Sequence, residues 1–443
     1  MGAILVYLIA AYIFITMFKT PWVAAVAYLA FGVMQPQYIW FWHFSSLPVS
    51  PSKILAILTI MAWCIAALNK KVDFSIYKNK QNFILLFIWA MVHLSDIFSP
   101  FPIYSTSIPA DIVLSVLNTI MILYFVSIGL LVSETALKYL SIGLIVPIVY
   151  YVYWSNDQYF SSRWYQFSQG RLMGPSGSIY KDENVFATVF IVGMPFILYS
   201  FFYVKNILLK YSAIIIIPLL WHSLFLTGSR GAMLASIIAT FIASRLIKSK
   251  IFNKLLIVGF VVALITQGGS MLNRSSETVE ISQDSSIEEP INPRITSWLH
   301  GLSHMKNHPI LGVGVQRFSH ATRVYFPESI PHVAHNTFIS LAAESGVLVG
   351  LVYLYLFWLT YKKYRFCVNN NVSKYPLIDY VNKATITSLA GFFICSIFLN
   401  LAIFEPFYYL LVMILVKQTV FEQKLLAEQK DCLKNTKKKI YAQ

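Results

Sequence analysis

The sequence predicts an all-α protein that crosses a lipid bilayer many times. Of its 443 residues, 57% are hydrophobic and only 12% are charged, whereas about a quarter of the residues in an ordinary soluble domain are charged. So few charges cannot cover a surface that faces water. The apolar residues occur in runs close to the roughly 20 residues that a helix needs to span the hydrocarbon. Aromatic residues cluster near the ends of these runs, as they do at membrane interfaces.

The apolar runs predict about 12 or 13 transmembrane helices. The first run lacks a basic start and a small-residue cleavage site, so we expect it to be retained as a span. It forms a tight pair with the second run around Lys19 and Pro21, and one of the two need not cross fully, which leaves the side of the N-terminus open. The runs lie near residues 2–18, 21–40, 52–69, 82–98, 110–132, 136–155, 184–204, 211–227, 230–247, 253–271, 337–361, 384–402 and 405–420.

The distribution of positive charge predicts the orientation from about residue 50 onward. The net charge is +15, and the lysines and arginines form short clusters on alternate loops, as they do on cytoplasmic loops. The long polar loops lack an interleaved basic and aromatic surface, which argues against nucleic-acid binding. The four cysteines indicate neither a disulfide nor a thiolate metal site. The loops expected to face outward are 99–109, 156–183, 271–336 and the turn near 403.

We therefore expect four regions along the chain. They are the N-terminal transmembrane helices (1–270), a large periplasmic loop (271–336), the C-terminal transmembrane helices (337–420) and a basic cytoplasmic tail (421–443). Function is expected on the long outward loops, because loops held by a rigid scaffold commonly carry binding and catalytic residues.

The large loop has internal structure of its own. Residues 277–289 are acidic and polar, and Pro293 follows shortly after them. From there, apolar residues recur at helical spacing and predict a short amphipathic helix whose apolar face lies on the membrane domain. The helix ends at His308 and Pro309, and a tight turn follows at 310–314. The apolar positions are Ile295, Trp298, Leu299, Leu302 and Met305.

The segment 331–336 carries the strongest candidate for chemistry. His335 stands at the water-facing start of a predicted helix, where an imidazole can meet a polar substrate and a lipid together. Its unperturbed pKa near 6.5 suits proton abstraction from a hydroxyl group. The alternative is an interfacial histidine that only caps the helix. His332 and His335 have a spacing that metal ligands can have, but no carboxylate or third histidine accompanies them, so no metal is predicted.

Arginines on the same outward side predict an anionic ligand. Arg230 stands where an outward turn enters a span, and a guanidinium at that depth is costly unless it is paired. Its planar fork suits phosphate oxygens. Arg294 opens the loop helix and could reach the same place. Alternatively, these arginines bind no ligand, and their side chains extend to the membrane surface or form salt bridges with nearby residues. Further candidates for substrate contacts are Arg171, Lys181, Arg317 and His332, together with Asn336.

Titratable residues inside or near the spans are weaker candidates for function. His93 and Asp96 lie one helical turn apart within a predicted span and could form a proton relay. Glu405 lies near the end of another span and could equally be interfacial. The chain contains no Walker motif, so hydrolysis of a nucleotide by that route is not expected.

Several of these segments together resemble the O-antigen ligase superfamily, which includes O-antigen ligases, Wzy-type polymerases and protein O-glycosylation ligases. The resemblance covers roughly residues 160–420. The N-terminal Gln35-Pro36 lies in a segment similar to the exosortase-associated O-glycosylation ligases, which usually have Asn-Pro there. The matching segments are Arg171–Gly174, Asp182–Ala187, Thr227–Gly231, Arg294–Trp298, His308–Gly314, His335-Asn336 and Glu344–Gly346.

The resemblance implies a GT-C-like helical glycosyltransferase of the bacterial inner membrane, with its site facing the periplasm. Such enzymes use a glycan on undecaprenyl pyrophosphate as donor, need no metal or other cofactor, and invert the anomeric carbon. By analogy, Arg230 and Arg294 would bind the pyrophosphate. His335 would orient or deprotonate the acceptor hydroxyl, with Asn336 supporting it. The acceptor would be lipid A–core, a protein or a polysaccharide.

Three alternatives remain beside a ligase. A Wzy-type polymerase would use the same lipid carrier and differ only in its acceptor. A transporter of a small solute such as bicarbonate would place charges near the membrane midplane, whereas the polar residues here gather at the outward edge. A non-catalytic scaffold in a glycan-export complex would not depend on Arg230 and Arg294.

Overall fold

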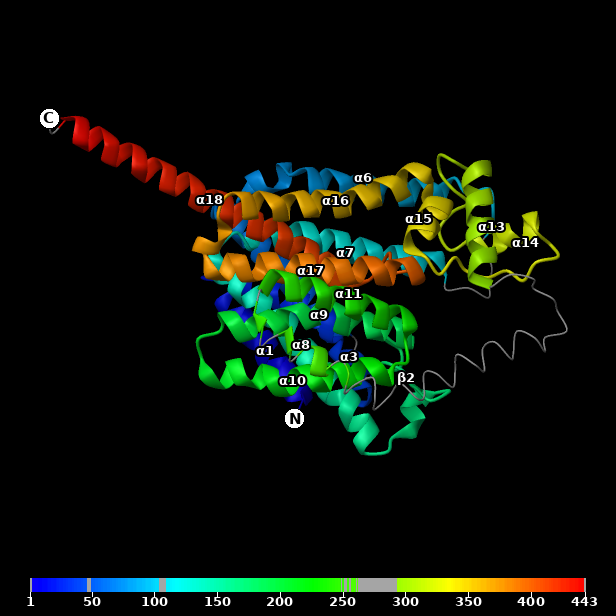
Figure 1. The fold of residues 1–443 in the computed structure, drawn as a ribbon. Coiled ribbons are helices and arrows are strands. Elements are labelled where there is room, and N and C mark those ends of the chain that lie inside the picture. Colours follow the sequence, from blue (N-terminus) through cyan, green and yellow to red (C-terminus); the bar gives the residue numbers. More distant parts are fainter. Residues whose placement is uncertain are drawn as a thin grey trace.

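The computed structural model describes residues 2–45, 49–102, 109–247 and 293–441, together with 249–250, 253–254, 256–259 and 261. It is a bundle of helices that run side by side (Figure 1). Within the described residues, seven helices are long and apolar enough to cross a membrane, which confirms the predicted all-α membrane class. They are α5 (Pro51–Leu68), α7 (Ala110–Leu130), α8 (Glu134–Phe160), α9 (Glu183–Tyr203), α10 (Ile207–Leu226), α11 (Arg230–Ile247) and α17 (Pro376–Phe398).

The other predicted spans fall on helices that are shorter or more polar. Two of these helices, α16 and α18, carry lysines on faces turned into the protein, at Lys363 and Lys417, which lowers their average hydropathy. The span predicted near 253–271 lies largely outside the described residues, and the acidic stretch 277–289 lies wholly outside them. The shorter or more polar helices on which predicted spans fall are α1 (Gly2–Thr16), α2 (Trp22–Met34), α6 (Lys80–Ile97), α16 (Val347–Asn369) and α18 (Glu405–Tyr441).

Two predicted spans are broken by left-handed backbone. The run 21–40 ends as a helix at Met34, because Gln35 has φ +48° and precedes Pro36. The short helices α3 (Pro36–Ile39) and α4 (Phe41–Phe44) follow. The single helix predicted over 337–361 is wrong. It is divided into α15 (Thr337–Ser345) and α16 by Gly346, whose φ of +102° favours glycine.

The core of the bundle is built around α9, which contacts α8, α10, α11 and α17. Most of its side chains are buried. Polar contacts fix its register against α17, since the hydroxyl of Ser388 donates to the carbonyl of Val192 at 2.7 Å and Tyr199 bonds Thr387 at 3.0 Å. Hydroxyl groups can be buried here because each has a partner.

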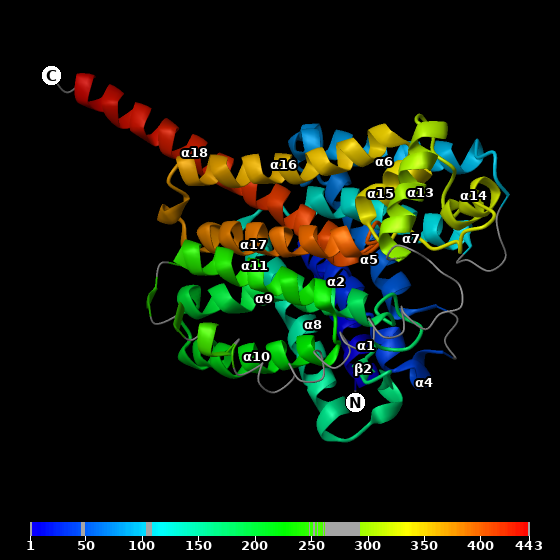
Figure 2. The ribbon, with the colours of Figure 1, turned by 45° about the vertical axis from the view of Figure 1, so that its right-hand side comes forward.

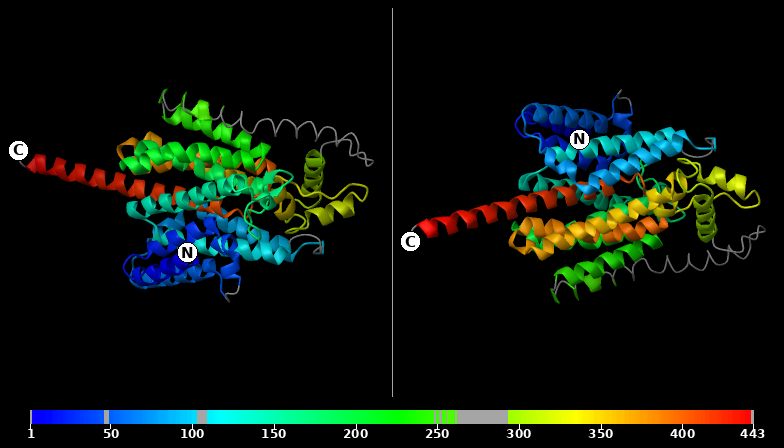
Figure 3. Two further views of the ribbon diagram at one scale, coloured as in Figure 1. Left: turned by 90° about the horizontal axis from the view of Figure 1, so that it is seen from below. Right: turned by 90° about the horizontal axis from the view of Figure 1, so that it is seen from above.

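One end of the bundle is covered by three short helices. Here α13 (Pro293–Asn307), α14 (Phe318–Tyr325) and α15 lie beyond the ends of the long helices (Figures 1 and 2). We call this the α13 end. From the opposite end, α18 extends well beyond the other helices (Figure 3). The remaining elements are η1 (Phe74–Lys78), η2 (Trp164–Gln166), η3 (Val372–Lys374) and the antiparallel pair of β1 (Phe167–Ser168) with β2 (Arg171–Leu172).

The predicted loop helix is present as α13, but the side that it packs inward is not the predicted one. Ile295, Leu299 and Leu302 are about half exposed. The buried side instead carries Ser297, His300, Gly301 and His304. Gly301 lies against Ile339 of α15 and Phe318 of α14, where a Cβ would overlap Ile339 and crowd Phe318. Small side chains therefore allow α13 to approach its neighbours closely, and this closeness outweighs the apolar pattern.

Candidate functional site

Two of the singled-out segments meet through their backbones at the α13 end. The amides of Val313 and Gly314 donate to the carbonyls of Ala343 and Glu344 at 2.9 and 3.0 Å, and the amide of Val347 donates to Pro309 at 2.9 Å. A Cβ on Gly346 would overlap the carbonyl of Ile310. The turn at 308–314 therefore fits directly against the break between α15 and α16 and fixes the position of α15.

His335 is held immediately before α15. Asn336 caps this helix, with its Oδ1 accepting the amides of Phe338 and Ile339 at 3.0 Å each. The hydroxyl of Thr337 donates to the carbonyl of Leu399 at 2.7 Å, which ties the same segment to the end of α17. His335 itself has φ +44°, a conformation that costs a non-glycine residue free energy and often occurs at functional sites. Its side chain is exposed.

Arg230, Arg294 and His335 are brought together from three separate segments. Arg294 lies in the first turn of α13, within electrostatic range of Arg230 at the start of α11 and of His335. Partial burial and the nearby charge of Arg230 lower the pKa of Arg294. All three residues keep part of their surface exposed.

The surroundings of His335 favour its neutral form. Desolvation is the main cause that lowers its pKa, and the charges of Arg294 and His332 add to the effect. Asp182 acts in the opposite direction and raises the pKa. Asp182 is the N-cap of α9, where its Oδ1 accepts the amides of Asn184 and Val185 at 2.9 and 3.0 Å. It lies in a segment already singled out, next to the exposed Lys181, yet nothing in its spacing showed that it faces a histidine about 150 residues later.

Arg171 is committed to contacts within the protein. Its Nε donates to the carbonyl of Thr227 at 3.0 Å, one terminal nitrogen donates to Asn184 at 2.7 Å, and the other pairs with Glu183. The guanidinium therefore joins β2 to the start of α9 and to the turn that leads into Arg230. This geometry gives Arg171 the means to position the site, whereas the sequence predicted contact with the substrate.

Arg317, also predicted to contact substrate, is buried and has partners within the protein. It forms an ion pair with Asp96 of α6 and donates to the carbonyl of Val315 at 3.1 Å. His93 has a different partner, the side chain of Asn118 at 2.7 Å. The predicted relay between His93 and Asp96 is therefore divided between two separate contacts.

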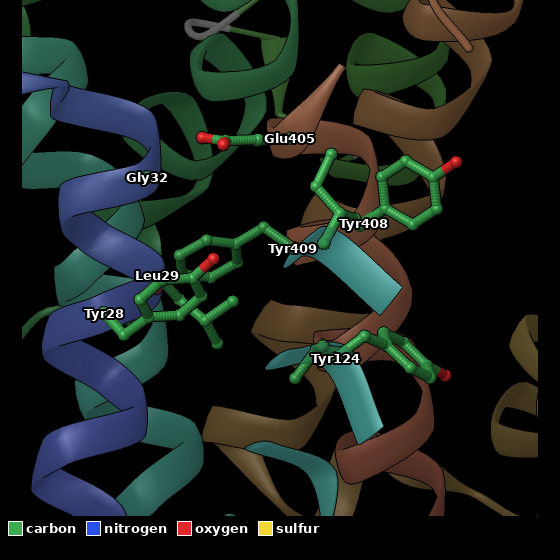
Figure 4. A pocket seen from close by; sticks show the side chains of 9 residues that line it. Tyr28, Leu29, Gly32, Tyr124, Glu405, Tyr408 and Tyr409 are labelled. Atoms are coloured by element: carbon green, nitrogen blue, oxygen red, sulfur yellow. The ribbon is translucent and has the colours of Figure 1, made fainter. Parts of the chain in front are cut away.

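A cavity between α2, α7 and α18 does not belong to this site. Its volume is about 20 Å³, less than a sugar ring needs. Glu405 extends from α18 toward Gly32 of α2 above Tyr409, as Figure 4 shows. In the described part of the chain, no group of three or more His, Cys, Asp or Glu side chains is arranged to hold a metal ion.

One comparison with known proteins bears on this geometry. Residues 213–354 match the family model described as O-antigen ligase, in agreement with the resemblance found in the sequence. The matched region contains Arg230, Arg294 and His335, whereas Arg171 and Asp182 precede it. Among curated proteins, no match was found.

Proposed function

We propose, on the basis of the match of residues 213–354 to the O-antigen ligase family model, that the protein is a membrane glycosyltransferase. It would transfer a glycan from undecaprenyl pyrophosphate to an acceptor hydroxyl at the periplasmic face of the bacterial inner membrane, without a metal and with inversion. The observation that carries this proposal is the meeting of two arginines and one histidine at the α13 end.

The two guanidinium groups suit the pyrophosphate. Arg230 and Arg294 repel one another, so an anion that lies between them relieves the repulsion while it gains charge-assisted hydrogen bonds. As the bond from the anomeric carbon to the pyrophosphate oxygen breaks, negative charge grows on that oxygen. Positive groups already in place stabilise the charge in the transition state.

His335 suits the other half of the reaction. The acceptor oxygen attacks the anomeric carbon, and its proton passes to the imidazole, which must therefore start out neutral. The lowered pKa of His335 keeps it neutral at physiological pH. Asp182 lies within electrostatic range and would stabilise the imidazolium once the proton has arrived. Asn336 and Arg171 hold the segments that carry His335 and Arg230, and we assign them positioning roles.

Ligase and polymerase would share this chemistry and differ only in the acceptor. Lipid A–core, a protein and a growing polysaccharide all offer a hydroxyl group to the same base. The composition of the surface glycan in a deletion strain separates the two. Loss of attached glycan with intact polymer on the lipid carrier identifies a ligase, whereas loss of the polymer itself identifies a polymerase.

The decisive test is transfer from a lipid-linked glycan by the purified protein in vesicles. Each of Arg230→Ala, Arg294→Ala and His335→Ala is expected to lower the rate by about 100-fold or more, the usual contribution of a general base or a charge-stabilising group. Arg163→Ala is the matched control, because this exposed arginine pairs with Asp157 outside the site. A His335→Ala protein that transfers as fast as the parent would remove the base from the proposal.

A further inference from the structure

Two lysines that take no part in the site described above are buried inside the bundle. Lys363 of α16 is 4% exposed and Lys417 of α18 is 1% exposed. Neither side chain reaches the surface, so neither ammonium group can extend to water as lysines near membrane boundaries usually do. The two are also within electrostatic range of one another.

Both ammonium groups are held by neutral partners. Lys363 donates to the side-chain oxygens of Asn79 and Gln81 at 3.0 and 2.7 Å. Lys417 donates to Oδ1 of Asn382 at 2.6 Å and also contacts the thiol of Cys367. Amide oxygens satisfy N–H donors, but they supply no negative charge.

Lysines outnumber carboxylates at this cluster. In the part of the chain that the structure describes, neither lysine forms an ion pair with a carboxylate. Glu422 acts electrostatically on Lys363, and its carboxylate accepts a hydrogen bond from Gln418 at 2.7 Å. When both lysines are protonated, one carboxylate leaves a single positive charge uncompensated, which is costly in a protein interior unless an anion is near.

Besides the two lysines, the cluster contains an amide whose N–H donor has no hydrogen-bond partner. The Nδ2 of Asn382 is buried without a hydrogen-bond partner, although the Oδ1 of the same amide accepts from Lys417. Asn382 is fully buried within α17. A buried amide donor without an acceptor is rare and calls for a partner. Here that partner would have to accept hydrogen bonds.

We propose that Lys363, Lys417 and Asn382 form a binding site for one small monovalent anion, of which chloride is the representative. One negative charge would neutralise the excess positive charge and accept the unpaired N–H of Asn382. The near-complete burial of all three side chains restricts the ligand to a small ion. Because α16, α17 and α18 each contribute one residue, the anion stabilises the packing of these three helices.

Thermal unfolding of the full-length protein in detergent tests this site without any glycan transfer. The melting temperature is measured in sodium chloride and in sodium gluconate at equal ionic strength, because gluconate is too large to enter. For the parent we expect a saturable rise of roughly 2–4 °C with chloride, from binding to the folded state alone. Lys363→Met and Lys417→Met should lose this rise. Lys362→Met should keep it, since Lys362 is exposed on the same helix.

A second variant covers the case in which the lysine variants do not fold. Asn382→Asp keeps the oxygen that accepts from Lys417 and places a negative charge where the anion would lie. It should fold, and its melting temperature in gluconate should match that of the parent in chloride. Equal melting of the parent in both salts, a full chloride response in Lys417→Met, or failure of Asn382→Asp to fold would each overturn the proposal.

Discussion

At the scale of single residues, the charges around His335 determine when it can accept a proton. Desolvation and Arg294 lower its pKa, whereas Asp182 raises it. If His335 is the base, kcat/KM should fall toward acid pH with an apparent pKa below the usual 6.5. Arg294→Gln should move this acid limb to higher pH, and Asp182→Asn should move it to lower pH. The position of the limb is read separately from the height of the plateau.

Arg294→Gln and Asp182→Asn control for one another, because they are expected to move the acid limb in opposite directions. Any general loss of folding would lower both plateaus without moving the limbs apart. Lys181→Gln provides a further comparison, because Lys181 is exposed beside Asp182 but does not act on His335. Limbs that move in the same direction, or not at all, would show that another group titrates.

The residues that could be predicted were those whose type conflicts with their position. Arg230 and Arg294 are basic on the side predicted to face outward, where basic residues are otherwise sparse, and His335 was predicted to begin a helix on that side. Partners of a side chain could not be predicted in this way. Arg317 pairs with a carboxylate 221 positions earlier, and Arg171 bonds a carbonyl 56 positions later. Only the fold determines such contacts.

At the scale of elements, the break at Gly346 sets the direction in which α15 points. Gly346→Ala should destabilise the protein by about 1–3 kcal/mol, because alanine is strained at φ +102° and its Cβ would overlap the carbonyl of Ile310. The displaced α15 should also lower the transfer rate, since His335 directly precedes it. Melting temperature and rate are measured together.

Gly259→Ala is the matched control for this change. A Cβ at Gly259 meets nothing within 4 Å, so its melting temperature should equal that of the parent or exceed it slightly. Unchanged melting of Gly346→Ala would mean that the turn at 308–314 can move away. Hydropathy did not reveal this break, because the apolar residues on both sides of Glu344–Gly346 together predict one span over 337–361. Likewise, the buried side of α13 was determined by Gly301 and Ser297, which carry no apolar signal.

At the scale of the whole molecule, composition predicted the all-α membrane class, because the chain as a whole has too few charged residues for a surface that faces water. The number of spans did not follow as directly. Several helices that run within the bundle carry polar residues whose partners lie on other helices, such as Gln81 of α6, which donates to Tyr124 and to the carbonyl of Leu411. Hydropathy counts such residues as a cost, although the fold satisfies them.

A contact between distant parts of the chain, the Arg317–Asp96 ion pair, helps to attach the α13 end to the bundle. The ion pair of Arg317 with Asp96 joins the segment before α14 to α6, and its two side chains are 7% and 23% exposed. Asp96→Asn should lower the free energy of unfolding by about 3 kcal/mol, because it leaves the Arg317 guanidinium in a largely buried place without its counter-charge. Thermal unfolding and protease cleavage within 308–336 measure the effect.

The double variant Asp96→Asn/Arg317→Met distinguishes attachment by charge from attachment by packing. If the pair acts mainly by mutual neutralisation, removal of both charges should cost much less than the sum of the single changes. Glu344 will then keep the backbone amides of Gln316 and Phe318 as its partners. Additive losses would instead show that each side chain is held by its other contacts, and that other contacts, such as the turn at 308–314 and the Thr337 hydroxyl, attach the α13 end.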